Sequence, residues 1–294
     1  MEKYGTTMGN SEISRYIGIP RSSFYSKRSE RKRGRKQSSF TTRIADEVEE
    51  IVSNTSVVEV IEDLLSREFV CYGYKKVTKH LQNFGYRINR KKVRRLMKES
   101  HLLNHSYNRK GTVRRVIDRK LKLTLPNEVW EMDIKYVWIQ GESRNAFLFV
   151  LMDCFTREEI GHYIGYSCRK DHVRMVMEFS FHDRGSENIK NLRIRSDNGP
   201  QFIAKMVGEY LSSVDIPHER IHPATPQEDG HIGAMNSIIE RELIRRFEFD
   251  SLEDVKNIID RYMMFYNGER IHSAIGYVTP REMYEKWMEK SRKA

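Results

Sequence analysis

The sequence predicts an α/β protein whose core, a mixed sheet flanked by helices, is preceded by small all-α units. Before residue 104, apolar residues recur at the three- and four-residue spacing of amphipathic helices. From residue 129 onward, apolar strand-like segments come first and then alternate with helical ones, which is typical of an α/β domain. Charge divides the chain similarly, with 29 Lys and Arg against 13 Asp and Glu in residues 1–126, and 23 against 28 in the remainder. This asymmetry predicts one part that grips a polyanion and another that carries carboxylate chemistry.

Composition narrows the possible partners. At 294 residues the chain is long enough for two domains, and its net charge of +11 favours nucleic acid. An acidic lipid surface would fit the same charge, but no segment has the roughly 18 apolar residues of a spanning helix and no signal peptide opens the chain. The cysteines Cys71, Cys154 and Cys168 are odd in number and lack metal-type spacing. They predict reduced thiols in a cytoplasmic protein.

Residues 1–37 are predicted to form a short helix-turn-helix-like segment and a basic linker. Residues 11–27 read as two short helices around a turn at Gly18-Ile19-Pro20, and an ordinary helical hairpin is the alternative. Residues 27–37 have no apolar period, so they form either a solvated linker or an arm that binds phosphates. The predicted DNA contacts in this part are Arg21, Arg31, Lys32, Arg33, Arg35 and Lys36.

Residues 38–104 are predicted to be a helical DNA-binding domain. Apolar positions between residues 42 and 66 follow a helical period, and a second helix around residues 75–82 follows the break at Tyr72-Gly73-Tyr74. Asn89 can cap a third helix with an apolar face and a strongly basic opposite face. A solvated face is the alternative to DNA contact. The predicted DNA contacts here are Lys75, Lys76, Arg90, Lys91, Lys92, Arg94 and Arg95.

The remainder divides into a linker over residues 105–126, a catalytic core over residues 127–285 and a tail over residues 286–294. Strands are predicted over residues 129–139, 146–154, 159–166 and 191–196, the first two as a hairpin. Helices are predicted over residues 171–181, 201–214, 229–246 and 251–267. Ser251 is the expected N-cap of the last helix, with Asp254 as its capping-box partner.

Two carboxylates stand out by their placement. Asp133 lies within an otherwise apolar strand, where an ionised side chain is costly unless a cation or a donor pairs with it. Asp197 ends a strand, directly before Asn198-Gly199; such a position suits a functional group but is also ordinary turn chemistry. Together, side chains on neighbouring strands can converge to hold Mg²⁺ through oxygen ligands.

Several ordered motifs carry a resemblance to a known family. They are YGY at residues 72–74, RRLMKE at 94–99, WEMDIKYV at 130–137, RSDNGPQF at 195–202, HPATPQEDGHI at 222–232 and YNGERIHSAIGYVTPREMY at 266–284. The segment from Trp130 to Glu282 resembles the catalytic core of retroviral integrases and of bacterial insertion-sequence transposases whose second reading frame encodes such a core. The upstream motifs resemble the DNA-binding segment that precedes these cores.

The resemblance implies an RNase H-like core with a catalytic triad of two aspartates and a glutamate. By motif, Asp133 and Asp197 are the aspartates, and the glutamate is expected at position 233, where this chain has glycine. Two Mg²⁺ ions, with Mn²⁺ as a substitute, would occupy an intact site. Gly233 offers no ligand, so we expect one weakly bound cation at Asp133 and Asp197 and impaired cleavage. Glu240 is too far along its helix to replace the glutamate.

The resemblance also implies the partners. They are double-stranded DNA, as terminal inverted repeats and target, a homodimer or larger assembly on DNA, and an upstream-frame DNA-binding protein, in a bacterial cytoplasm at the nucleoid. Asn198 and Asn236 are predicted to contact DNA ends or metal-bound water, with local capping as the alternative. The main rival function is a non-catalytic protein that binds and pairs transposon ends. A nuclease without strand transfer and a repressor using only residues 1–105 are further alternatives.

Overall fold

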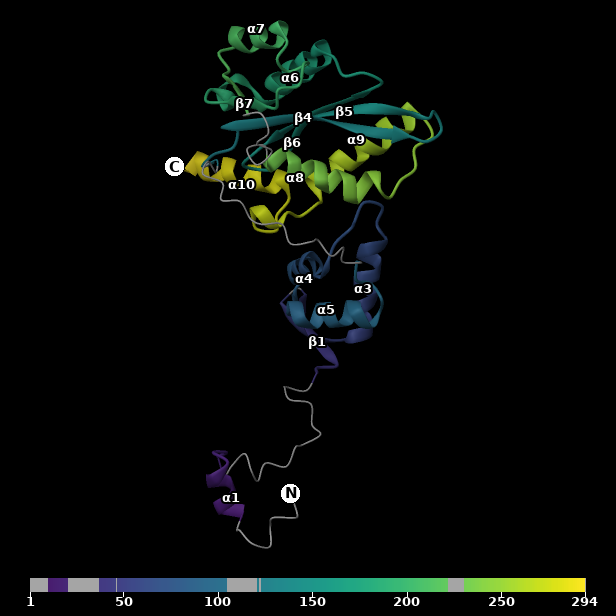
Figure 1. Ribbon diagram of the computed structural model, residues 1–294, viewed down its shortest axis with the longest axis vertical. Coiled ribbons are helices and arrows are strands. Elements are labelled where there is room, and N and C mark those ends of the chain that lie inside the picture. Colours follow the sequence, from purple (N-terminus) through teal and green to yellow (C-terminus); the bar gives the residue numbers. More distant parts are fainter. Residues whose placement is uncertain are drawn as a thin grey trace. The chain divides into compact units, whose positions relative to one another are not determined.

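A computed structural model describes residues 10–20, 37–45, 47–104, 121, 123–221 and 230–293 (Figure 1). The chain divides into two compact units, Met1–Ser39 and Phe40–Ala294. The first unit contains helix α1 (Asn10–Tyr16), which agrees with the first helix of the predicted helix-turn-helix. The predicted second helix and the basic run with Arg21, Arg31, Lys32, Arg33, Arg35 and Lys36 lie outside the described residues.

The second unit begins with a β-hairpin, so the prediction of one helix over residues 42–66 is wrong for its first part. Strands β1 (Phe40–Ala45) and β2 (Val48–Ser53) pair antiparallel, and the short β3 (Tyr86–Arg87) adds to β1. The segment is rich in β-branched Thr, Ile and Val, which favour strands. Helix α3 (Asn54–Ser66) starts only where the Ser53 hydroxyl accepts a hydrogen bond from the Ser56 backbone N–H, at 3.0 Å. That cap was the boundary signal missed in the sequence.

The two basic helices agree with the sequence prediction. Helices α4 (Tyr74–Asn83) and α5 (Arg90–Glu99) follow, and the Asn89 side chain caps α5 by accepting from the Lys92 backbone N–H at 2.9 Å. The predicted apolar face of α5 is buried, and it packs in one core with apolar residues of α3 and α4. The basic residues of α5 therefore lie on the side of the helix opposite this core.

The core is a five-stranded mixed sheet in the order β6-β5-β4-β7-β8. Strands β4 (Val129–Ile139), β5 (Arg144–Asp153) and β6 (Glu159–Gly165) are antiparallel, which confirms the predicted hairpin. Strands β7 (Arg193–Ser196) and β8 (His218–Arg220) continue the sheet in parallel with β4. An antiparallel meander extended by parallel strands on the side of its first strand is the RNase H-like arrangement.

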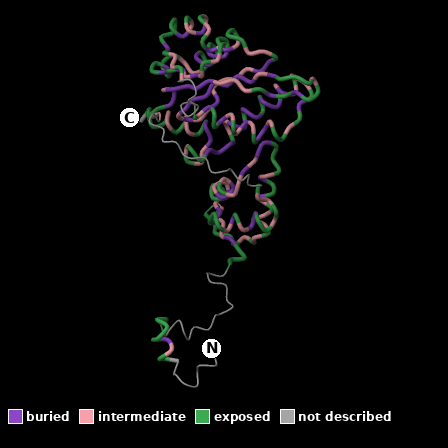
Figure 2. The backbone as a smooth tube through the Cα atoms, in the orientation of Figure 1, coloured by how far each residue is buried: buried purple, intermediate pink, exposed green. Residues whose placement is uncertain are grey.

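Helices cover both faces of this sheet (Figure 1). Helices α6 (Lys170–Arg184) and α7 (Lys205–Ser213) lie on one face, with the short turn η2 (Ser186–Ile189) between them in sequence. On the other face lie α8 (Gly230–Ile239), its π-helical extension η3 (Glu240–Ile244), α9 (Leu252–Gly268) and α10 (Pro280–Lys293), with the turn η4 (Ser273–Ile275) before α10. Figure 2 shows the strands buried between these layers.

The alternation of side chains along β4 decides where its acids point. Trp130 and Met132 belong to the core under α6 and α7, whereas Val137 and Ile139 belong to the core under α8 and α9. Since successive side chains of a strand face opposite sides, the odd-numbered Glu131 and Asp133 face α8. The sequence therefore places two acids of one strand beside one helix.

Several smaller predictions are settled by the fold. The Ser251 hydroxyl caps α9 by accepting from the Asp254 backbone N–H at 3.1 Å, but the Asp254 carboxylate accepts from Asp250 instead of from Ser251. The predicted tail over residues 286–294 continues helix α10 as far as Lys293. All three cysteines are free thiols, as expected. Among the described residues, no helix is both long and apolar enough to cross a membrane.

Candidate active site

The two predicted aspartates meet because β4 and β7 are neighbouring parallel strands. Met132 pairs with Ser196 in their register, so Asp133 is the next residue of β4 and Asp197 is the residue directly after β7. The turn after β7 holds Asp197 through a hydrogen bond from the Gly199 backbone N–H to Oδ1, at 2.8 Å. Asp133 accepts from the Ile134 backbone N–H at 2.7 Å. The fold therefore brings together two carboxylates that are 64 residues apart in the chain.

The electrostatics of the pair follow from burial. Burial raises the pKa of Asp133 to about 6, and the neighbouring charge of Asp197 adds to the rise, whereas hydrogen bonds from Ile134 and Asn236 oppose it. Two carboxylates in a partly buried site repel each other unless a proton or a cation lies between them. The arrangement favours binding of a divalent cation.

Helix α8 and its extension η3 are held along β4 by three polar contacts in regular register. The Ile232 N–H donates to Glu131 Oε2 at 2.8 Å, Asn236 Nδ2 donates to Asp133 Oδ2 at 2.6 Å, and Lys135 Nζ pairs with Glu240 Oε2 at 2.9 Å. Two residues of a strand advance about 6.7 Å and four residues of a helix about 6 Å. The alternate residues of β4 thus match every fourth residue of the helix.

Gly233 lies on α8 between the first two of these contacts. It is exposed, and a Cβ atom added to it would meet no atom within 4 Å. The Glu240 carboxylate is engaged by Lys135 and by Arg245, at 2.9 and 3.0 Å. Glu228 and Asp229 lie outside the described residues. Glu240 is therefore engaged elsewhere, whereas the backbone has room for a carboxylate at position 233.

The residues present fit one hard divalent cation. Asp133 and Asp197 supply carboxylate oxygens, which suit Mg²⁺ and Mn²⁺. Beside them the amide oxygen Oδ1 of Asn236 is buried and has no hydrogen-bond partner among the described residues. A buried amide oxygen without a partner indicates a missing donor or cation. Asn198, in contrast, donates to the carbonyl of Ile221, 23 residues further along the chain, at 3.0 Å.

The predicted DNA-binding Lys and Arg side chains of α4 and α5 differ in their exposure and in their contacts within the chain. Lys75, Arg90, Lys91 and Arg94 are exposed, and Arg95 is half-buried. Lys92 Nζ donates to the Phe40 carbonyl. Lys76 Nζ is buried without a hydrogen-bond partner in the described part, 4.7 Å from the centre of the Tyr72 ring. Burial, with the charge of Arg270, lowers the pKa of Lys76 to about 7.

A buried ion pair joins the end of the α8 helix to the C-terminal motif. Arg270 Nε and Nη2 donate to the Glu242 carboxylate at 2.6 and 2.7 Å. Burial, with the charges of Arg270 and Lys76, lowers the pKa of His272 to about 2, so its ring is neutral and accepts from Arg270 Nη1 at 2.9 Å. Arg270 and His272 thus organise this turn.

Sequence reasoning missed Glu131 and Glu242. Glu131 is fully buried on the strand that carries Asp133 and holds the N-terminus of α8. Its signal was the spacing of two, which puts both acids on one side of β4. Glu242 gave no comparable signal, because its partner Arg270 is 28 residues away in the chain.

Comparison with known proteins agrees with this geometry. Two family models, each described as an integrase core domain, match residues 124–226 and 214–280, and a model described as an HTH-like domain matches residues 54–110. The transposase for insertion sequence element IS904 of Lactococcus lactis is 28% identical over 228 residues, which is 74% of this chain and 88% of that protein. An IS476 protein of Xanthomonas euvesicatoria is 26% identical over 212 residues, and the match spans 71% of this chain and 59% of its relative.

Among solved structures, the HTLV-2 integrase catalytic core in complex with magnesium is 20% identical, with a TM-score of 0.40, over 54% of this chain and 97% of that one. The sheet, the paired aspartates and the family models define a polynucleotidyl transferase core of the integrase type. The chain belongs to the bacterial insertion-sequence transposases of the DDE type.

Proposed function

We propose that this transposase binds and pairs transposon ends and that its cleavage chemistry is impaired at position 233. The observation that carries the proposal is Gly233, which supplies no ligand at the expected third carboxylate while the space around it stays open. Helices α4 and α5 would contact the terminal inverted repeats through Lys75, Arg90, Lys91 and Arg94, which are exposed. Because two ends must meet, we expect at least a dimer on DNA. An upstream-frame partner stays a prediction.

Asp133 and Asp197 are the residues that would hold Mg²⁺, or Mn²⁺ in its place. Such an ion, when bound, activates the attacking hydroxyl and stabilises the charge that develops on the phosphate. The chain's own contribution is positioning: Asn236 orients Asp133 by donating to Oδ2, and the Gly199 N–H fixes Asp197. Without a carboxylate at position 233, a second ion lacks its ligand, and a two-ion site is incomplete.

The reaction of an intact site would be hydrolysis of one strand at the transposon end, followed by attack of the freed 3′-hydroxyl on another phosphodiester. The first step breaks a phosphodiester bond with water and leaves a 3′-hydroxyl and a 5′-phosphate. The second step forms one ester bond at phosphorus as it breaks another, so neither step requires an external energy source. In this chain we expect both steps to be slow in Mg²⁺. In Mn²⁺, which tolerates imperfect ligand sets, we expect residual cleavage that depends on Asp133.

Pairing of ends tests the proposal. Labelled duplexes with the inverted repeats that flank the gene would be mixed with the chain in EDTA and analysed by gel shift for complexes that hold two duplexes. We expect paired complexes, and we expect Arg90→Ala combined with Arg94→Ala to weaken them. Failure to bind these duplexes better than scrambled ones would overturn the proposal.

The second candidate, a non-catalytic end-pairing protein, is favoured by the same glycine. A cleavage assay in Mn²⁺ distinguishes the two candidate functions. Cleavage in Mn²⁺ that disappears in Asp133→Asn supports an impaired transposase, and no cleavage under any condition supports the non-catalytic protein.

A further inference from the structure

A second cluster of metal-ligand side chains lies beside the aspartate pair, on residues the reaction does not use. Glu131 comes from β4, Cys154 directly follows β5, and His231 is the second residue of α8. One ligand atom from each lies within 4.8 Å of the other two. We propose that Glu131, Cys154 and His231 form a binding site for Zn²⁺ that is separate from Asp133 and Asp197.

The donor set selects the metal. A thiolate, an imidazole and a carboxylate together are typical of Zn²⁺, whereas Mg²⁺ prefers oxygen ligands alone. In a tetrahedral site with Zn–N and Zn–O bonds of about 2.0–2.2 Å, the nitrogen and oxygen atoms lie roughly 3.4 Å apart. His231 Nδ1 and Glu131 Oε1 are 3.3 Å apart. Two of the three ligand atoms therefore already have the required separation.

Burial supports a cation at this place. Glu131 and Cys154 are fully buried, and His231 keeps 24% of its side chain exposed. A buried carboxylate is costly unless a cation or several donors compensate it. Among the described residues, the ion-pair partner found for Glu131 is the His231 ring, and no Lys or Arg pairs with it. Zn²⁺ would supply a positive charge beside Glu131, and the partly exposed His231 gives the ion a way in.

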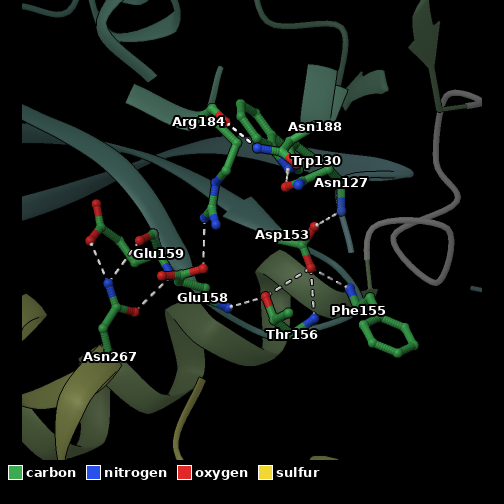
Figure 3. Close-up of polar contacts among 10 residues, drawn as sticks. All are labelled: Asn127, Trp130, Asp153, Phe155, Thr156, Glu158, Glu159, Arg184, Asn188 and Asn267. Carbon is green, nitrogen blue, oxygen red and sulfur yellow. Dashed lines mark hydrogen bonds and ion pairs between the residues drawn. The ribbon is translucent and has the colours of Figure 1, made fainter. Parts of the chain in front are cut away.

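Hydrogen bonds hold two of the ligands in place: one to the carboxylate of Glu131, as is usual for metal ligands in proteins, and one from the backbone of Cys154. Glu131 Oε2 accepts from the Ile232 N–H at 2.8 Å, which leaves Oε1 towards His231. Cys154 is fixed by its backbone N–H, which donates to the Val129 carbonyl at 3.0 Å. The preceding Asp153 accepts from Asn127, from Phe155 and twice from Thr156, so the turn that presents Cys154 is rigid (Figure 3).

Ion binding is coupled to loss of a proton. In the metal-free site Cys154 is a buried free thiol, which carries a proton. Binding of Zn²⁺ forms the Zn–S bond and releases this proton to solvent. Three protein ligands leave a fourth position, which water fills.

Zn²⁺ at this site would affect the position of helix α8. The site joins β4 two residues before Asp133 to α8 two residues before Gly233. A bound ion would fasten the N-terminus of α8 to the sheet and so fix the helix that carries position 233 and Asn236. The inference concerns metal binding alone and does not depend on whether the chain cuts DNA.

The test uses the untagged full chain, stripped with EDTA, without DNA. Titration with Co²⁺ should give the near-ultraviolet thiolate-to-cobalt absorption band at one ion per chain, and Zn²⁺ should displace it and raise the Tm. Cys154→Ser should abolish the band and weaken Zn²⁺ by at least about a hundredfold, because even the loss of an outer hydrogen-bond partner costs about 10- to 100-fold. Cys168→Ser, at a half-buried cysteine outside the cluster, is the matched control and should keep both signals.

Two further variants make the result decisive. His231→Gln removes a partly exposed ligand, so it should fold and lose the Tm rise even if Cys154→Ser does not fold. Asp197→Asn should keep the cobalt band, which separates this site from the catalytic pair. Absence of the band in the unaltered chain, or its loss in Asp197→Asn, would overturn the inference. If Cys154→Ser binds Zn²⁺ as well as the unaltered chain, the cluster is held by hydrogen bonds alone.

Discussion

Removal of the Glu242 carboxylate should be among the most destabilising single changes in this chain. The side chains of Glu242 and Arg270 are 1% and 3% exposed, and two hydrogen bonds of 2.6 and 2.7 Å join them. Glu242→Ala leaves the Arg270 guanidinium buried without its counter-ion, which costs about 3–5 kcal/mol. Since a domain has only about 5–15 kcal/mol in total, urea unfolding followed by circular dichroism should show a large loss.

The exposed pair Arg174 and Glu178 provides the control. Its nitrogen and oxygen are 2.8 Å apart, but the side chains are 45% and 43% exposed. Glu178→Ala should therefore cost at most about 1 kcal/mol. The double variant Glu242→Met with Arg270→Met removes both buried charges and should be more stable than Glu242→Ala. A loss below about 1 kcal/mol for Glu242→Ala, equal to the control, would refute the reasoning.

Three further predictions concern stability. Hydrogen bonds and charges of Glu159 and Asp260 raise the pKa of His162 to about 9, although burial opposes the rise. The protonated ring therefore stabilises the folded chain by on the order of 1–3 kcal/mol. This stabilisation is complete below about pH 6.5 and is lost as pH rises through 9. Urea unfolding should find His162→Gln less stable at pH 6 and equal at pH 10, and a pH-independent difference would contradict this. Lys76→Met removes a buried ammonium that lacks a hydrogen-bond partner in the described part. The Tm of this variant at pH 6 should therefore be several degrees above that of the unaltered chain. A lower Tm would show that the ammonium is stabilising. Asn89→Ala removes the cap of α5 and should cost about 1 kcal/mol in chemical unfolding; no measurable loss would argue against the cap.

Much of the core could be predicted because its signals are local. The apolar runs gave β4 and β5, and the turn after Ser196 gave the end of β7. Asp133 and Asp197 could be assigned from their motifs, and the parallel register of β4 and β7 explains why they meet.

What the sequence concealed depends on contacts between distant residues or on competing periods. The segment from Phe40 to Ser53 has apolar residues at spacings that suit a helix, yet its β-branched residues pair with each other and with Tyr86 and Arg87 as strands. The buried role of Glu131 requires α8, which begins 99 residues later. Burial of the Lys76 ammonium beside the Tyr72 ring also requires the tertiary fold.

We propose that position 233 alone limits cleavage. Cleavage of a labelled transposon-end duplex in Mg²⁺ should be compared between the unaltered chain, Gly233→Glu, and Gly233→Glu combined with Asp197→Asn. The open space at Gly233 admits the new side chain, so we predict that only Gly233→Glu cuts efficiently and that the combined variant is inactive. Equal cleavage by the unaltered chain and Gly233→Glu would contradict the account, because another group would then supply the third ligand.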